Sequence, residues 1–211
     1  MIGIIGATGS GKTTTVDIIL GLLEAQQGKL KVDETVITKE NLRSWQRNIG
    51  YVPQNIYLID DSIAANIALG VADNEIDLDR VEKASKIANL HDFVEKELPE
   101  KYQTIVGERG VRLSGGQRQR IGIARALYHK AEVLVFDEAT SSLDGVTEKM
   151  IMEAIHEFSG KKSIILIAHR LKTVQKCDQI FFIDKGRVVD HGTYVELIER
   201  NKNFRNMALH A

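Results

Sequence analysis

The sequence has few of the features that mark secreted, disordered or membrane-spanning chains. Cys177 is its one cysteine, so no disulfide framework can form, as is usual in a reducing compartment. It has two prolines and no Ser/Gly-rich tract or repeat, which argues against long linkers and disorder. No apolar run approaches the roughly 18 residues that cross a bilayer. The N-terminus lacks the basic region of a signal peptide, so we expect none.

The sequence also has no large excess of charge of one sign. The 28 Lys and Arg residues nearly balance 29 Asp and Glu residues, for a net charge of −1. Proteins that bind nucleic acid usually carry a strongly basic face, so we expect no nucleic-acid partner. The length of 211 residues allows one large domain with a buried core, or a main domain with a smaller lobe.

What the sequence does contain is a glycine-rich loop, Gly6-Ala7-Thr8-Gly9-Ser10-Gly11-Lys12-Thr13-Thr14, which follows a short apolar run and opens an apolar-rich segment. The order strand, loop, helix is the context of the phosphate-loop pattern G-x-x-x-x-G-K-[ST]. Glycines let backbone N–H groups curl around a polyphosphate at a helix N-terminus. Lys12 is predicted to reach the outer phosphates, and the Thr13 hydroxyl is predicted to ligate Mg²⁺.

The rest of the chain alternates between apolar runs and amphipathic segments, which predicts an α/β fold with a mostly parallel sheet. Strands are expected at 29–33, 49–52, 133–136 and 163–168, with a hairpin around Lys185-Gly186. Helices are expected at 14–23, 39–45, 62–69, 77–89, 117–128, 147–158 and 194–209. The segment 14–23 is apolar nearly all round, so we expect it to be buried. The stretch from about 54 to 125 is predicted to form an inserted helical lobe.

A pair of acids, Asp137 and Glu138, ends the predicted strand at 133–136. Ligands of open α/β sheets bind beyond the carboxyl ends of the strands, so these acids are expected to face the phosphate loop. One carboxylate can hold Mg²⁺ while the other orients and deprotonates a water molecule. The plain alternative is a strand that turns polar as it leaves the core.

A second glycine pair, in Leu113-Ser114-Gly115-Gly116-Gln117, opens another helix. It offers a second phosphate-binding N-terminus, although Ser114 is also a good N-cap. One nucleotide needs only one such phosphate-binding cradle. Two cradles in one chain therefore predict a head-to-tail dimer, in which the second cradle of each subunit binds the nucleotide of the other subunit. His169 follows the strand at 163–168; a lone histidine is more often structural, but this position favours a functional one.

Together these residues resemble the ATP-binding cassette (ABC) ATPases over essentially the whole chain. Gly6–Thr13 resembles the Walker A loop, Gln54 the Q-loop glutamine and Leu113–Gln117 the signature motif. Asp137 with Glu138 resembles Walker B and its catalytic glutamate, Ser141–Asp144 the D-loop, and His169 the switch histidine. The resemblance implies ATP held between two cassettes and hydrolysed with Mg²⁺.

The resemblance also implies roles for single residues. Catalysis would fall to Glu138, His169, Gln54 and Lys12, and Mg²⁺ to Thr13, Gln54 and Asp137. Nucleotide contacts would come from Gly6, Ala7, Thr8, Gly9, Ser10, Gly11, Lys12, Thr13, Thr14, Ser114, Gly115, Gly116 and Gln117.

Within the family, the segments 104–110, 114–120 and 184–192 are similar to exporter cassettes, with the nearest likeness to bacterial lipid and glycolipid flippases. Exporters imply transmembrane partner domains, which this chain does not contain, and a place at the cytoplasmic face of the inner or plasma membrane. Segments 60–69 and 106–110 are expected to meet that partner.

One departure concerns the start of the chain. Family cassettes carry an adenine-stacking aromatic residue on antiparallel strands about two dozen positions before Walker A, and only five residues precede Gly6 here. We therefore expect residues 1–211 to be a single ABC ATPase domain, N-terminally truncated, without those strands.

Three other function classes stay open. A soluble cassette ATPase of DNA repair, chromosome organisation or translation would share every motif, but the chain has neither a long heptad insertion nor a second cassette. A nucleotide kinase would share the phosphate loop, and Leu113–Gln117 argues against it. A cassette that binds ATP without hydrolysing it is the third possibility.

Overall fold

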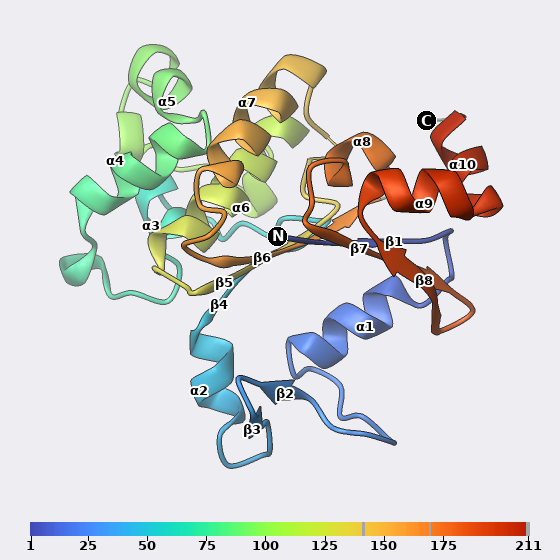
Figure 1. The fold of residues 1–211 in the computed structure, drawn as a ribbon. Coiled ribbons are helices and arrows are strands. Elements are labelled where there is room, and N and C mark those ends of the chain that lie inside the picture. Colours follow the sequence, from blue (N-terminus) through green and yellow to red (C-terminus); the bar gives the residue numbers. More distant parts are fainter. Residues whose placement is uncertain (141, 169, 210–211) are drawn as a thin grey trace. The chain divides into compact units, whose positions relative to one another are not determined.

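The computed structural model describes residues 1–140, 142–168 and 170–209. The chain forms two compact units whose segments alternate in sequence. The first unit comprises Met1–Ile49, Glu132–Glu138 and Lys162–Ala211, and the second comprises Gly50–Ala131 and Ala139–Lys161. Figure 1 labels their elements.

The first unit is built on a mostly parallel sheet. Its five strands follow the order β5-β6-β1-β7-β8. Their bounds are β1 Ile2–Ile5, β5 Val133–Asp137, β6 Ser163–Ala168, β7 Gln179–Asp184 and β8 Arg187–Gly192. Strand β1 lies parallel to β6 and β7, and only β8 pairs antiparallel, with β7. The sixth strand of the sheet, β4 (Ile49–Val52), begins in this unit and ends in the other.

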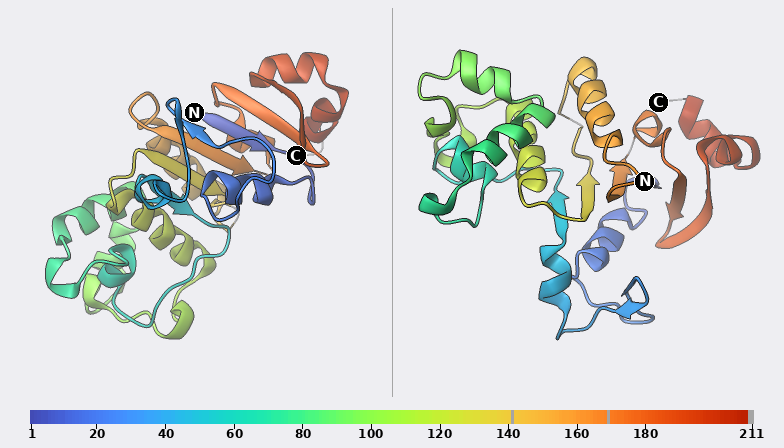
Figure 2. Two further views of the ribbon diagram at one scale, coloured as in Figure 1. Left: turned by 90° about the horizontal axis from the view of Figure 1, so that it is seen from below. Right: turned by 60° about the vertical axis from the view of Figure 1, so that its left-hand side comes forward.

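Helices cover both faces of this sheet, as expected for central strands that are apolar along their length. Figure 1 shows α1 and α8 on opposite faces. The helices are α1 Lys12–Ile19, α2 Leu42–Arg47, α8 Leu171–Val174, α9 Tyr194–Arg200 and α10 Lys202–Leu209. A small hairpin of β2 (Lys31–Val32) and β3 (Thr35–Val36) follows α1, and the right view of Figure 2 shows it apart from the main sheet.

Helix α1 differs from the expectation for 14–23. It begins at Lys12 and ends at Ile19, because Gly21 takes the left-handed conformation that stops a helix (φ 68°). The indole N–H of Trp45 donates to the Ile19 carbonyl at 2.7 Å and satisfies one of the last carbonyl groups. Leu22 therefore lies outside the helix and is 62% exposed. The expected burial of this segment is confirmed for Val16 and Leu20 and is wrong for Leu22 and Leu23.

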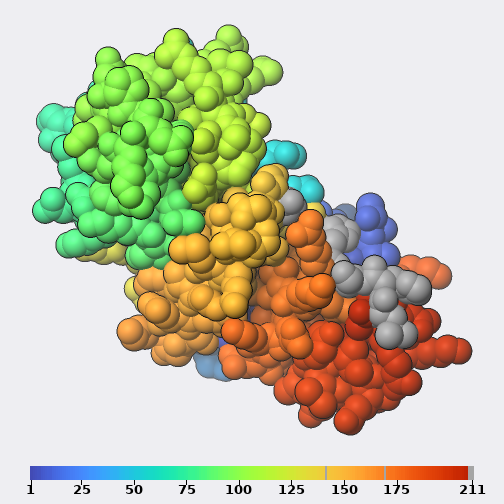
Figure 3. Space-filling view, turned by 90° about the horizontal axis from the view of Figure 1, so that it is seen from above, coloured from blue at the N-terminus to red at the C-terminus, as the bar shows by residue number. Residues whose placement is uncertain are grey.

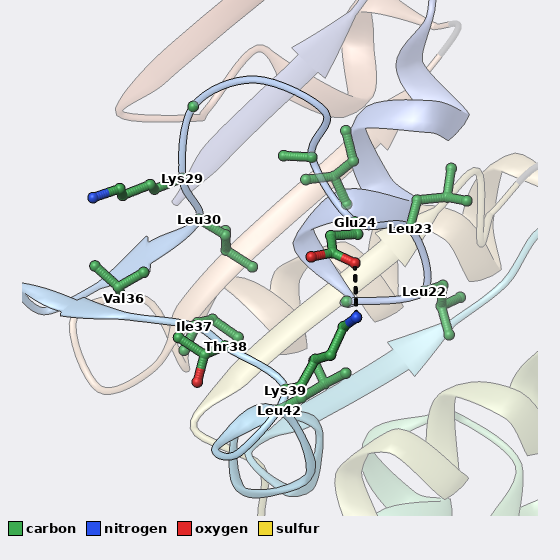
Figure 4. A pocket seen from close by; sticks show the side chains of 14 residues that line it. Leu22, Leu23, Glu24, Lys29, Leu30, Val36, Ile37, Thr38, Lys39 and Leu42 are labelled. Carbon is green, nitrogen blue, oxygen red and sulfur yellow. Dashed lines mark ion pairs between the residues drawn. The ribbon is translucent and has the colours of Figure 1, made fainter.

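The residues after α1 line a pocket of about 340 Å³ that they share with the β2–β3 hairpin. Figure 4 shows Leu22, Leu30 and Leu42 around it, with the Lys39 ammonium 3.5 Å from the Glu24 carboxylate at its rim. Both ions are well exposed to solvent, so this pair adds little stability.

The second unit is helical. Its elements are α3 Ile63–Ile67, η1 Asp73–Glu75, α4 Leu78–Ile87, α5 His91–Glu97, η2 Lys101–Gln103, η3 Glu108–Gly110, α6 Gly115–Tyr128 and α7 Gly145–His156. Helix α6 is its centre, because α3 and α4 both pack against it. Figure 3 shows the surface of α4 and α5, in green, beside the yellow-green residues of α6.

Side chains cap several helices of this unit. The side chains of Ser62 and Asp77 accept from backbone N–H groups at the starts of α3 and α4. Helix α7 begins two residues before the predicted start because Asp144 caps it through Val146 and Thr147. In the first unit, by contrast, α2 begins at Leu42 rather than at the expected residue 39 and has no side-chain cap.

The α/β fold with a mostly parallel sheet and a helical insertion is confirmed. Helices α5 and α8 were not predicted, since both are short and short helices depend on tertiary packing rather than on sequence propensity. The predicted C-terminal helix is divided at Asn201 into α9 and α10. The stretch 54–125 lies in the second unit, and the assignment of 1–211 as one truncated domain stays a prediction.

The one cysteine of the chain is chemically quiet. Cys177 is buried against β1, where a Cβ atom at Gly3 would lie 3.3 Å from its sulfur. Burial raises the pKa of this thiol to about 12, so almost none of it is the reactive thiolate at neutral pH. No described helix combines the length and the apolar character needed to cross a bilayer.

Candidate nucleotide-binding site

The phosphate loop connects β1 to α1 in the first unit, and its glycines are required by its geometry. Gly9 and Gly11 have φ angles of 78° and 105°, a region that residues with a Cβ atom seldom adopt. Gly6 is required for a different reason, because a Cβ atom there would lie 2.2 Å from the carbonyl oxygen of Ile183. The loop is thus a bare backbone cradle.

The turn between β7 and β8 holds this cradle from outside. The N–H of Gly186 donates to the Ser10 carbonyl at 2.8 Å, and a Cβ atom at Gly11 would lie 3.2 Å from the Cα of Gly186. The sequence predicts the hairpin but not this support, because nothing in a local turn pattern indicates what the turn touches.

The donors of the loop are suited to an anion. The N-cap of helix α1, Gly11, has no side chain that could accept a hydrogen bond, so the first N–H groups of the helix need another acceptor. Among the described residues, the buried Ser10 hydroxyl also has no hydrogen-bond partner. A polyphosphate would satisfy these donors, and the helix dipole favours its charge. The residues present therefore fit the triphosphate of ATP.

Lys12 lies inside the loop. Its ammonium group donates to the carbonyl oxygens of Gly6 at 2.8 Å and Ala7 at 3.1 Å, and its side chain is buried. Desolvation lowers the pKa of Lys12, while the nearby carboxylates of Glu138 and Asp137 act to raise it. The structure thus brings a cation of the loop close to the two predicted acids in one unit.

The two acids stand at the carboxyl end of β5. Asp137 is the last residue of the strand and is buried, while Glu138 is half-buried. Glu138 has a φ angle of 51°, and its N–H donates to the Ile167 carbonyl of β6 at 2.9 Å. A left-handed glutamate is strained, and such strain is concentrated at functional sites.

Mg²⁺ fits this arrangement only together with the nucleotide. The Thr13 hydroxyl and the Asp137 carboxylate are hard oxygen donors of the kind Mg²⁺ prefers. In the described part of the chain, no three His, Cys, Asp or Glu side chains form a cluster that could hold a metal ion. Phosphate oxygens and water would have to complete the coordination, as is usual for this ion.

The signature segment lies in the second unit. Ser114 caps α6, and Gln117 completes a capping box: the Gln117 N–H donates to the Ser114 hydroxyl at 3.1 Å, and the Ser114 N–H donates to Gln117 Oε1 at 2.7 Å. Ser114 and Gly115 are exposed at the N-terminus of this 14-residue helix. Gln117, predicted to contact nucleotide, has a structural role within its own unit.

Arg118 is a residue that the sequence reasoning missed as a contributor to this loop. Its guanidinium donates to the carbonyl oxygens of Leu113 at 2.6 Å and Gly110 at 3.4 Å. It therefore holds the loop that leads into the glycine pair. The sequence offers one indication of this role, because Arg118 lies one turn after Ser114. A basic residue at such a position is, however, more simply interpreted as solvent-exposed.

The structure does not test the roles predicted for the remaining site residues. Gln54 is exposed in the second unit, two residues after β4 ends. His169 and Ser141 lie outside the described residues. Their predicted roles stay predictions.

Comparison with known proteins identifies the family of the chain. The family model described as "ABC transporter" matches residues 1–141. The chain is 44% identical over 206 residues to an ATP-dependent lipid A-core flippase of Saccharophagus degradans, covering 98% of the chain and 35% of the relative. It is 39% identical over 208 residues to the ABC multidrug transporter MDR2 of Trichophyton tonsurans, covering 98% of the chain and 15% of that protein.

A solved structure is also similar, that of a bacterial Atm1-family ABC exporter with ATP bound. The TM-score is 0.93 at 35% identity, over 99% of this chain and 36% of the exporter chain. The chain thus spans about a third of the length of the flippase and of this exporter. With a family match over more than half of its length, the chain belongs to the ABC transporter family, as an ATPase domain similar to those of exporters.

Proposed function

We propose that the chain is the ATP-hydrolysing part of an exporter or flippase and works as a head-to-tail pair of cassettes. The observation that carries this proposal is the Lys12 ammonium, held inside the glycine loop and close to Asp137 and Glu138. A soluble cassette of the repair or translation type has less support, because the relatives compared above are described as a flippase, a multidrug transporter and an exporter.

In this proposal each side chain of the first unit has a separate task. The N–H groups of the loop and the Lys12 ammonium bind and orient the phosphates. Thr13 and Asp137 hold Mg²⁺, which when bound neutralises charge that develops on the phosphate oxygens. The Glu138 carboxylate accepts the proton of the attacking water. Gln54 is proposed as a further ligand of the metal, and His169 as a contact to the reacting phosphate.

The second unit supplies the contact between cassettes. Ser114 and Gly115 are exposed and Gly116 is half-buried at the N-terminus of α6, which is proposed to bind the nucleotide held by a second copy of the chain. A Cβ atom at Gly115 would meet only Ser142 at 3.7 Å and Arg118 at 4.0 Å. Packing within the second unit therefore does not require a glycine at position 115. We propose that the glycine is there to leave room for a ligand.

Of the segments 60–69 and 106–110 expected to meet the membrane partner, the first is restricted by the burial of α3. Ser62 is 7% exposed and every residue of α3 is buried, so the centre of that segment cannot meet a partner. The exposed apolar side chains beside it are Tyr57, Ile105 and Val111. We propose that these three meet a cytoplasmic loop of the membrane domains, which places the chain at the cytoplasmic face of the membrane.

The proposed surface is joined to the signature helix. Arg125 of α6 donates from its guanidinium to the Tyr57 carbonyl at 3.1 Å and to the Asn66 carbonyl at 2.8 Å. Burial lowers the pKa of Arg125 to about 10, so it stays charged at neutral pH. Ile56 also packs where α6 has Gly122, since a Cβ atom there would lie 2.3 Å from the Ile56 Cδ1. A shift of α6 would therefore carry the Tyr57 loop with it.

Replacing the proposed base tests hydrolysis. Glu138→Gln keeps the shape but removes the basicity, so we expect kcat for ATP to fall roughly 10²–10⁴-fold while MgATP binding persists. The matched control is Glu153→Gln, which changes an exposed carboxylate of α7 and should leave kcat unchanged. Steady-state phosphate release and equilibrium binding are the measurements. Turnover of Glu138→Gln near that of the wild type would exclude the assigned role.

Dimer formation tests the second cradle. On the Glu138→Gln background, light scattering should detect a dimer when MgATP is added. Gly115→Asp should prevent it, because the new carboxylate lies where the triphosphate of the opposite copy is proposed to bind. Gly115→Asn adds a side chain of the same size without the charge and should retain more dimer. A dimer that forms equally well with Gly115→Asp would argue against the head-to-tail arrangement.

Crosslinking tests the membrane surface in the intact transporter. Val111→Cys places a thiol at a side chain that is 76% exposed, against the low background of the buried Cys177. It should crosslink to a cysteine in a cytoplasmic loop of the membrane domain. The control is Val195→Cys on α9, where the side chain is 63% exposed. Equal crosslinking of both positions, or of Val195→Cys alone, would place the partner elsewhere.

A further inference from the structure

Gln119 is a buried polar side chain on the signature helix. It is 2% exposed, and its Oε1 accepts from the backbone N–H of Ser142 at 3.0 Å. It lies one helical turn after Gly115 on α6, and residues four apart share a helix face. The bond therefore joins the first turns of α6 to the segment 142–144, which follows the predicted acids in the chain.

The two segments are also in direct contact. A Cβ atom at Gly116 would lie 3.4 Å from the Ser142 carbonyl oxygen and 3.6 Å from Leu143 Cδ2. A Cβ atom at Gly115 would lie 3.7 Å from Ser142 Cβ. The backbone of the glycine pair thus lies against Ser142 and Leu143, and the hydrogen bond from the Ser142 N–H to Gln119 adds a directional interaction to this contact.

The segment is held on its other side by α7. The Asp144 carboxylate accepts from the N–H groups of Val146 at 3.1 Å and Thr147 at 3.0 Å. The Thr140 hydroxyl donates to the Glu148 carboxylate at 2.8 Å, and the Leu143 N–H donates to the Thr140 carbonyl at 3.1 Å. Thr140 and Asp144 are therefore bonded to α7, and Thr140 is two residues after Glu138 in the chain.

We propose that Gln119 is a positioning residue that makes the signature glycines and the segment after Glu138 move as one body. Phosphate binding at Gly115 and Gly116 then reaches residues 140–144 through Ser142, and through the chain itself reaches the orientation of Glu138. Gln119 does not touch nucleotide in this proposal, since it is buried. The inference rests on the proposed function, in which the glycine pair binds phosphate and Glu138 is the base.

The test compares Gln119→Met with Gln119→Glu in the full chain. Methionine has similar length but accepts only weakly, so the Ser142 N–H loses its partner. We expect kcat for ATP to fall roughly 10- to 100-fold, the size of effect that misplacement of a catalytic group produces, with KM within about twofold. Glutamate keeps an acceptor oxygen, and at this buried position it is expected to take up a proton, since burial disfavours the charged carboxylate; the neutral acid has the shape of glutamine and should restore most of kcat.

A matched control separates this role from a loss of folding. Gln46 donates one bond from its side chain to a backbone carbonyl, that of Leu20 at 3.2 Å, and belongs to neither the glycine pair nor segment 140–144. Gln46→Met should change the melting temperature more than kcat per active molecule. Unchanged kcat in Gln119→Met, or a fall that Gln46→Met reproduces and Gln119→Glu does not correct, would overturn the proposal.

Hydrogen exchange tests the hydrogen bond between the Ser142 N–H and Gln119 without relying on activity. The Ser142 amide should exchange faster in Gln119→Met, while the amides in the middle of α6 keep their rates. MgATP should slow exchange at 142–144 in the wild type and not in Gln119→Met. A wild type without ATPase activity would overturn the proposed function alone. Exchange at Ser142 that is the same in wild type and Gln119→Met would overturn the positioning role alone.

Discussion

The hydrogen bonds from the Lys12 ammonium to the Gly6 and Ala7 carbonyls are the interaction on which the rest of the site depends. They hold a desolvated cation inside a loop whose own N–H groups favour an anion. Such a cation is costly to bury unless charge is placed nearby, and Asp137 and Glu138 supply it from the end of β5. The strand order of the first unit serves this arrangement, because β1 and β5 flank β6 and deliver the loop and the acids at the same edge.

Helix α6 has the corresponding place in the second unit. Its first turn is the glycine pair, its second turn bonds Ser142 through Gln119, and its last turns hold the Tyr57 loop through Arg125. One rigid element therefore connects the proposed phosphate contact, the segment after Glu138 and the proposed membrane surface. A 14-residue helix transmits displacement along its axis with little deformation, since every interior backbone group is bonded within it.

The sequence was sufficient for the parts that depend on local pattern. Glycine spacing predicts the phosphate loop, and the end of an apolar strand predicts where Asp137 and Glu138 lie. Ser62 and Asp77 indicate where their helices begin. It was insufficient wherever tertiary contact decides. Leu58 is buried in a loop and Ile56 packs because α6 has Gly122 at that point, and no local signal shows this. The roles of Arg118 and Gln119 could not be predicted for a related reason, because polar residues on a helix predict a solvent-exposed face.

The most direct test of the central claim is the affinity of the chain for MgATP with and without the Lys12 charge. Lys12→Met keeps the apolar stem and removes the ammonium, and Lys29→Met makes the same change at an exposed lysine. A hydrogen bond to a charged group contributes roughly 1.5–3 kcal/mol, or about 10- to 150-fold in affinity. Calorimetric titration should therefore give at least about tenfold weaker MgATP binding for Lys12→Met, with unchanged binding for Lys29→Met and no loss of melting temperature in either. Wild-type affinity in a folded Lys12→Met protein would contradict the account.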